Sequence, residues 1–358
     1  MNSKNILKKF GLARLIIALF LVGLFVAAPF AGVSVSDSFQ NVLSRFGMFS
    51  ILVLSLVPMV QSGCGLNFGI PIGVVGGILG GVTSIEFGFK GYMGIFMAMV
   101  FAVIFSLVFG AIYGFVLNKI KGDEMLIATY VGYSFTSFMC IAYLLLPYKN
   151  PISVLSYSGA GLRQQIPVAD YWMTSTVGEA GNKLSLGLIT NFLSFKIGSA
   201  LIPVGMFILF AIFAFIVWAF FKTKTGTAMT SVGSNPDYAR ASGIHINRAR
   251  LVSVMLSTAI ASVGIIVYQQ SYGFIQLYQA PLAFTFQTVA ALLIGGASIN
   301  KATIPHVIIG TFLFQGIITL TPTVINGAFN IDISEILRMI VTNGMIVYAL
   351  TRRNRNNE

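Results

Sequence analysis

The sequence has few charged side chains and few residues that carry chemistry. Only 9% of its 358 residues are charged, with 10 Asp and Glu against 22 Lys and Arg. There are two His and two Cys, without the spacing of metal ligands or of a disulfide framework, and no Gly-rich nucleotide-binding loop ending in Lys-Ser or Lys-Thr. We therefore expect no catalytic site, no metal and no cofactor in this chain. Cys64 and Cys140 are interpreted as small apolar side chains.

Apolar residues dominate the composition. Hydrophobic residues make up 56% of the chain and the mean hydropathy is +0.87, outside the range of soluble domains. They fall in blocks of roughly 18 to 25 residues, long enough for a helix to cross a hydrocarbon layer ~30 Å thick. These blocks lack the alternating polarity of a transmembrane barrel. The sequence predicts an all-α polytopic integral membrane protein, with one transmembrane domain over residues 1–358.

About ten transmembrane helices are expected. The first apolar run exceeds the hydrophobic stretch of a signal peptide, so it is interpreted as an uncleaved helix. The predicted spans are 12–32, 46–61, 66–84, 92–117, 125–147, 199–221, 251–270, 284–298, 303–320 and 333–351.

The distribution of basic residues predicts the orientation. Most of the 22 Lys and Arg fall before the first span, in the 118–124 turn, in the 222–250 loop and in the C-terminal tail, which lie on one side of a ten-helix arrangement. The positive-inside rule places that side in the cytoplasm. We expect both termini to be cytoplasmic and the long 148–198 segment to be extracytoplasmic. The excess of positive charge is thus attributed to the membrane, and no nucleic-acid partner is expected.

Ten helices divide into two sets of five, and an odd number of crossings per set makes any duplication inverted, a geometry common in transporters. Leu66-Asn67-Phe68 with Gly80-Gly81 in the third span resembles Leu282-Ala283-Phe284 with Gly295-Gly296 in the eighth. Two interpretations stay open: an internal 5+5 inverted repeat, or the general abundance of glycine in membrane helices.

The predicted spans contain few candidates for a polar pathway. Glu335 and Arg338 share one helix face and are expected to pair or to reach the interface. In the third span, glycines at four-residue spacing favour close helix packing; alternatively, they and a proline form a broken helix that lines a conduit. The candidate conduit residues are Asn67, with its amide open to solute, Phe68, Pro71, Gly73, Gln287, Gly295 and Gly296.

The 148–198 segment carries Tyr148, Tyr157, Tyr171 and Trp172 among Gly, Ser and Pro. Aromatic residues at this position anchor a chain at the membrane interface. Docking of an extracytoplasmic partner explains them equally well.

The 222–250 loop is predicted to contain a short exposed helix. Asn235 suits an N-cap, Pro236 the first helical position and Asp237 the positive end of the helix dipole, while Gly243 suits the end of the helix. A plain linker would not need both start and stop residues, although a surface helix without a partner is the alternative.

This segment resembles the cytoplasmic coupling region of permease subunits of ABC importers, in the family of ribose and other simple-sugar permeases, related to nucleoside and branched-chain amino acid permeases. Two further stretches are similar to the family, Ser62 to Gly69 and Ala290 to Ser298. The chain departs from the family at Asn67, where Asp is usual, and at Tyr238, where a small residue is usual. The matching and candidate coupling residues are Gly233, Asn235, Pro236, Asp237, Ala239, Arg240, Ser242, Gly243 and Ile244.

The resemblance implies a non-enzymatic transport subunit of the bacterial cytoplasmic membrane that imports a simple sugar or a nucleoside. Its implied partners are a cytoplasmic ATPase subunit that binds ATP and Mg²⁺, an extracytoplasmic solute-binding protein, a second permease copy or paralogue, and the lipid bilayer. The alternative is an ATP-independent carrier or channel for a small polar solute.

Overall fold

The protein is a polytopic bundle of α-helices. The computed structural model describes residues 12–120, 124–155, 161–177, 183–197, 200–278, 280–329 and 334–355, and a helix occupies each of the ten predicted spans. Six of the described helical segments are long and apolar enough to cross a membrane, and three shorter ones are apolar. The main helices are α2 Leu12–Ala27, α3 Val35–Leu54, α4 Leu56–Gln61, α5 Ile70–Glu86, α6 Gly91–Lys119, α7 Glu124–Leu145, α10 Val204–Lys222, α13 Ile246–Tyr272, α14 Ala280–Ile294, α15 Ile304–Phe329 and α16 Ser334–Arg355.

Several predicted boundaries are wrong for local reasons. The second span begins at Val35 rather than at residue 46, because the Ser34 hydroxyl caps the helix by accepting the Asp37 N–H at 3.3 Å. The third begins at Ile70 rather than at residue 66, because residues 62–69 form a largely buried turn between α4 and α5. The ninth ends at Phe329 rather than at residue 320, and Pro322 lies inside this helix.

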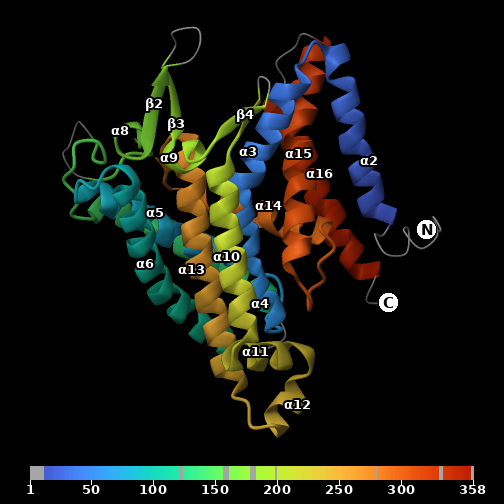
Figure 1. The fold of residues 1–358 in the computed structure, drawn as a ribbon. Coiled ribbons are helices and arrows are strands. Elements are labelled where there is room, and N and C mark those ends of the chain that lie inside the picture. Colours follow the sequence, from blue (N-terminus) through green and yellow to red (C-terminus); the bar gives the residue numbers. More distant parts are fainter. Residues whose placement is uncertain are drawn as a thin grey trace.

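Helix packing repeats between the two halves of the bundle. α3 packs against α15 as α13 packs against α6, and α5 packs against α7 as α14 packs against α16, while α3 and α13 contact each other. In a 5+5 repeat, α3 corresponds to α13, α5 to α14, α6 to α15 and α7 to α16. The contact of α3 with α15 is then equivalent to that of α13 with α6, and the contact of α5 with α7 to that of α14 with α16, as the repeat predicts. In Figure 1 the start of α2 and the end of α16 point toward the end of the bundle where α12 lies.

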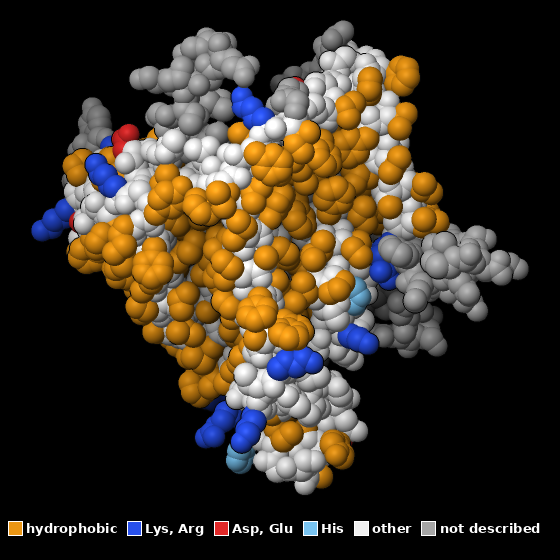
Figure 2. Space-filling model, in the orientation of Figure 1, with side chains coloured by type: hydrophobic (Ala, Val, Ile, Leu, Met, Phe, Trp, Pro, Cys, Tyr) orange, Lys and Arg blue, Asp and Glu red, His pale blue; other side chains and the backbone are white. Residues whose placement is uncertain are grey.

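The outer surface suits a lipid environment. Figure 2 shows hydrophobic side chains over the middle of one face, with Lys and Arg at its margins. The exposed residues of α10 include Ile212, Phe215 and Trp218, and those of α6 include Phe96, Ile104 and Ile112. Such side chains are stable against hydrocarbon and costly against water.

The segment after α7 holds small sheets that the all-helical prediction did not include. The three antiparallel ladders pair β1 Gln165–Pro167 with β6 Phe274–Gln276, β2 Met173–Val177 with β3 Lys183–Gly187, and β4 Phe195–Ile197 with β5 Ala200–Ile202. Short helices η1 Pro29–Ala31, α8 Ala169–Trp172 and α9 Leu188–Asn191 complete the order of described elements, apart from two helices that follow α10.

Aromatic residues fix this segment to the bundle rather than to lipid. Trp172 is completely buried, and it lies where a side chain on Gly81 of α5 would meet it. Tyr171 is also buried, and the Tyr148 hydroxyl lies 2.8 Å from that of Thr83. The membrane-anchor interpretation is therefore wrong for Tyr171 and Trp172. Tyr157 lies outside the described residues, and docking of an outer partner stays a prediction.

Candidate functional site

A short capped helix, α12 Pro236–Ala241, lies at one end of the molecule, as the sequence predicted. The Asn235 side-chain oxygen accepts the N–H groups of Asp237 at 3.1 Å and Tyr238 at 3.0 Å. Proline occupies the first turn, where its missing N–H costs nothing. Gly243 follows the helix with φ of +78°, a conformation that glycine adopts without strain. Asn235 and Pro236 thus begin the helix, and Gly243 follows its end, as the sequence predicted.

The 222–250 segment connects α10 to α13, and it contains more helix than the single short one that the sequence predicted. α11 Lys224–Ser234 precedes α12, and α13 begins at Ile246 rather than at residue 251. Thr223 caps α11 by accepting the Gly226 N–H at 3.2 Å, and Met229 and Val232 bury one face. The cap at Thr223 and the three-residue spacing of Met229 and Val232 are sequence features by which α11 could have been predicted.

α12 is attached to α11 and α13 on one side and exposed on the other. Ala239 is fully buried in a small cluster with Met229, Val232 and Ala249. In contrast, Tyr238 is 68% exposed, and the exposed Arg240 lies 3.6 Å from Asp237. The buried side holds the helix in place, and the outer side is free to contact another protein.

Two glycines join this segment to the membrane core. A Cβ added to Gly233, near the end of α11, would overlap the carbonyl oxygen of Gln61 at the end of α4. A Cβ on Gly63 would lie 2.9 Å from the Cα of Gly233. Two backbones can approach this closely only where neither residue has a side chain. Gly233, which belongs to the predicted coupling segment, is therefore a contact point between the α11–α12 segment and the α4–α5 turn.

Asn67 is the centre of a buried hydrogen-bond network in the α4–α5 turn. Its side-chain oxygen accepts the Gly69 N–H at 2.9 Å and the Tyr113 hydroxyl at 3.1 Å, and its amide donates to the Ser257 hydroxyl at 2.8 Å. Because Asn67 is completely buried, the expectation that its amide is open to solute is wrong. The side chain instead ties the turn to α6 and α13.

A second polar contact links the same turn to α13. The hydroxyls of Ser62 and Ser253 lie 2.7 Å apart, and the Cys64 sulfur lies 3.4 Å from the Ser62 hydroxyl. Burial raises the pKa of the Cys64 thiol, which therefore stays protonated at neutral pH. These contacts satisfy non-helical backbone and side-chain groups inside the bundle, where water is excluded.

Most other conduit candidates have packing roles. Pro71 lies in the first turn of α5 and does not break it. A Cβ on Gly73 would lie 2.6 Å from the Thr258 carbonyl of α13, so the packing interpretation holds there. A Cβ on Gly295 would overlap the His306 carbonyl of α15. The residue that follows, Gly296, has φ of +96° and lies beside Arg14.

Two further candidates, Phe68 and Gln287, lie at or on α14. Phe68 is buried, with its ring centroid 5.8 Å from that of Phe286 on α14. Gln287 is half-buried on the next position of the same helix, and Ala283 one turn earlier is exposed. Consecutive helix positions point about 100° apart, so Phe68 packs against α14 while Gln287 lies on the side of the helix that carries Ala283.

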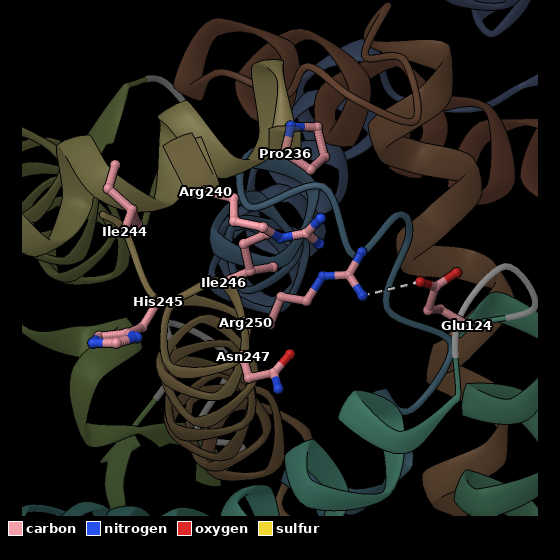
Figure 3. A pocket seen from close by; sticks show the side chains of 8 residues that line it. All are labelled: Glu124, Pro236, Arg240, Ile244, His245, Ile246, Asn247 and Arg250. Atoms are coloured by element: carbon pink, nitrogen blue, oxygen red, sulfur yellow. Dashed lines mark hydrogen bonds and ion pairs between the residues drawn. The ribbon is translucent and has the colours of Figure 1, made fainter. Parts of the chain in front are cut away.

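A pocket of about 540 Å³ lies between α12, the start of α13 and the start of α7 (Figure 3). Arg240 and Arg250 extend into it, and Arg250 forms an ion pair with Glu124 at 3.1 Å. Sequence analysis missed this pair because its members are separated by 126 positions and neither lies in a motif. In the parts of the chain that the structure describes, no three His, Cys, Asp or Glu side chains gather as a metal site.

Comparison with known proteins assigns the chain to a family. The family described as the permease component of branched-chain amino acid transport systems matches residues 38–350, which is most of the chain and contains both α12 and the α4–α5 turn. The chain belongs to this permease family.

Individual relatives are similar to the permease over only part of their length. It is 29% identical over 160 residues to the autoinducer 2 import system permease protein LsrC of Enterobacter sp. strain 638, 43% of the chain and 46% of the relative. It is 32% identical over 114 residues to the nucleoside ABC transporter permease protein NupB of Lactococcus lactis subsp. cremoris, 30% of each. The probable ABC transporter permease protein YphD of Escherichia coli K12 is 28% identical over 149 residues, 42% of the chain and 43% of the relative. The chain thus spans less than half of each of these relatives.

Two helices of the permease expose polar side chains that lipid would not favour. On α7, Tyr130, Tyr133, Ser134 and Ser137 share one face and are all exposed. On α16, Asn343 and Gly344 are exposed. Both helices contact α14, so the accessible side of α14 lies between them. The three- and four-residue spacing on α7 was a sequence feature that could have revealed this face.

Proposed function

We propose that this chain is the membrane-spanning subunit of an ATP-driven importer, with α12 as the element that a cytoplasmic ATPase subunit grips. The observation that carries the proposal is the pairing of an exposed, capped helix with a backbone contact, at Gly233, to the α4–α5 turn. Movement of α12 would displace that turn, and through Asn67 and Ser253 it would displace α6 and α13. Family membership supports the assignment, and ATP with Mg²⁺ would bind the partner subunit.

The proposed solute is a simple sugar or a nucleoside. Support comes from the names of two relatives, which describe an autoinducer 2 import system and a nucleoside ABC transporter. A solute-binding protein would deliver the solute to the outer side, where residues 161–177 and 183–197 lie. The near absence of charge within the described spans suits a neutral solute, because a charged one would lose hydration without compensation.

A second permease copy or a paralogue would complete the conduit. The Ser137 hydroxyl on α7 donates to the Tyr133 carbonyl at 3.0 Å. The exposed polar side chains of Ser134 on α7 and Asn343 on α16 are unfavourable against hydrocarbon, and a partner chain or a water-filled passage would satisfy them. The exposed faces of α7 and α16, both of which contact α14, and the half-buried Gln287 on α14 are the proposed wall of that passage.

The protein would lie in the bacterial cytoplasmic membrane with both termini inside. The ends of α2 and α16 that lead to the termini lie toward α12 (Figure 1), the side that the basic residues predict to be cytoplasmic.

The test is reconstitution of the chain with its ATPase and binding protein in liposomes. Tyr238→Ala and Arg240→Ala remove exposed side chains of α12 without disturbing its buried side, and Thr225→Ala at the exposed start of α11 is the control. We expect stimulated ATP hydrolysis and solute uptake to fall together, by more than about 10-fold in the double variant, since interface anchors are worth about 2 kcal/mol each. Uptake by the chain alone, without ATP, would instead establish the carrier alternative.

A further inference from the structure

A second pocket lies at the opposite end of the bundle from α12. α13 begins beside α12 and ends at Tyr272, and β6 and the start of α14 follow directly. The pocket has a volume of about 500 Å³, within the range of roughly 300–1,000 Å³ common for small-molecule sites. It is lined by Gln164, Gln276, Leu277, Tyr278, Ala280 and Ala283.

We infer that this outer pocket binds an uncharged solute rich in hydroxyl groups, a pentose ring or its nucleoside, before the solute passes along α14. The inference rests on the proposed function, because it identifies the solute class and the residues that receive it.

The walls of the outer pocket are fixed by contacts between distant segments. The Tyr278 hydroxyl donates to the Leu162 carbonyl at 2.7 Å, and its ring centroid lies 5.8 Å from that of Tyr143 in α7. The Leu277 N–H donates to the Gln164 carbonyl at 3.0 Å, next to the β1–β6 ladder. Tyr278 has φ of +51°, a conformation that costs a non-glycine residue free energy and persists only where its surroundings hold it. The pocket is therefore preformed.

The lining suits hydroxyl groups and offers no partner for charge. Gln164 and Gln276 are exposed, and each primary amide can donate to and accept from a hydroxyl. None of the lining side chains is charged. The neighbouring Arg163 is not part of the pocket lining, and it donates to the carbonyls of Val154 at 2.7 Å and Pro151 at 3.0 Å.

The helix end at the outer pocket is also a poor anion site. The first N–H of α14, that of Ala280, donates to the Leu277 carbonyl at 3.1 Å, and Pro281 has no N–H. A zwitterionic amino acid would lose the hydration of both charged groups and would find only neutral amides, and no opposite charge, among the described lining residues. A sugar would exchange water for the two glutamine amides.

The outer pocket leads toward the proposed conduit. Ala280, Ala283 and Gln287 are spaced by three and four residues, so they lie on one face of α14. Gln287 lies about 10 Å farther along the helix than Ala280, at a rise of ~1.5 Å per residue. A solute that leaves the pocket would next meet the third glutamine on this face.

Saturation-transfer NMR on the purified full-length chain in lipid nanodiscs tests the inference, because it detects weak binding without the partner subunits. The probes are ribose, adenosine and leucine. We expect transfer to ribose and adenosine and none to leucine; transfer to adenosine alone would show that the base contributes to recognition.

Gln164→Leu and Gln276→Leu should each weaken binding about 2- to 10-fold, the usual effect of one neutral hydrogen bond. Gln165→Leu is the matched control, because Gln165 is an exposed neighbour that does not line the pocket. Equal transfer to leucine, absence of transfer to both other probes, or unchanged binding by the two variants would overturn the inference. Loss of ATP-driven uptake with intact ribose binding would instead count against the proposed function alone.

Discussion

Gly233 tests the backbone contact at the scale of one residue. In Gly233→Ala the new methyl group would overlap the Gln61 carbonyl, so the α4–α5 turn or α11 must shift. We expect a loss of about 1–3 kcal/mol of stability, as for other overpacked sites. Thermal unfolding of the purified chain in detergent measures this loss. Gly23→Ala is the matched control, since nothing lies within 4 Å of its Cβ and alanine stabilises a helix by about 0.5–1 kcal/mol. Equal midpoints for the two variants would contradict the contact.

Single residues differ in how well sequence analysis predicts their roles. Asn235, Pro236 and Gly243 act within a few positions of themselves, so local cap rules were sufficient. Asn67 was misassigned because its partners Tyr113 and Ser257 lie 46 and 190 positions away, and no local pattern shows that a polar side chain is already satisfied.

α12 allows a test at the scale of one element. Asn235→Ala removes the acceptor for the Asp237 and Tyr238 N–H groups, and loss of an N-cap costs about 1 kcal/mol. We expect hydrogen exchange of those two amides to accelerate about fivefold, with less stimulation of the partner ATPase. Ser234→Ala is the control, because the Ser234 hydroxyl bonds only within α11, to the Thr230 carbonyl at 2.9 Å. If both variants exchange alike, the cap has no role in ordering α12.

Elements were predicted best where apolar length decides them. A helix lies in each of the ten predicted segments, because a bilayer requires about 20 apolar residues per helix, and six of the described helical segments are long and apolar enough to cross a membrane. α11 was missed because it is polar, with only Gly226, Met229 and Val232 buried. The strand pair β1–β6 joins residues more than a hundred positions apart, and three-residue strands carry too little alternation to predict.

At the scale of the whole molecule, the order of the membrane helices followed from the apolar blocks alone, because a helix occupies each of the ten predicted spans. The side of each loop, which the basic residues predict, stays a prediction. What each lateral surface contacts could not be predicted from the sequence, because an exposed face of a membrane helix can meet lipid, water or another chain. Polarity separates these cases once the structure shows which face is exposed. The exposed side chains of α10 include Ile212, Phe215 and Trp218, whereas α7 exposes Ser134 and Ser137 together with apolar side chains such as Phe138.

Disulfide cross-linking in native membranes tests whether α7 faces a second copy. In a background with Cys64→Ser and Cys140→Ser, Ser134→Cys should form a covalent dimer under mild oxidation, because the proposed second copy lies against the exposed face of α7. Ile212→Cys on the apolar face of α10 is the control and should stay monomeric, since lipid separates such faces. Cross-linking on α10 but not on α7 would place the partner on the α10 face instead. The exposed faces of α7 and α16 would then face lipid, and their polar residues could not form a conduit.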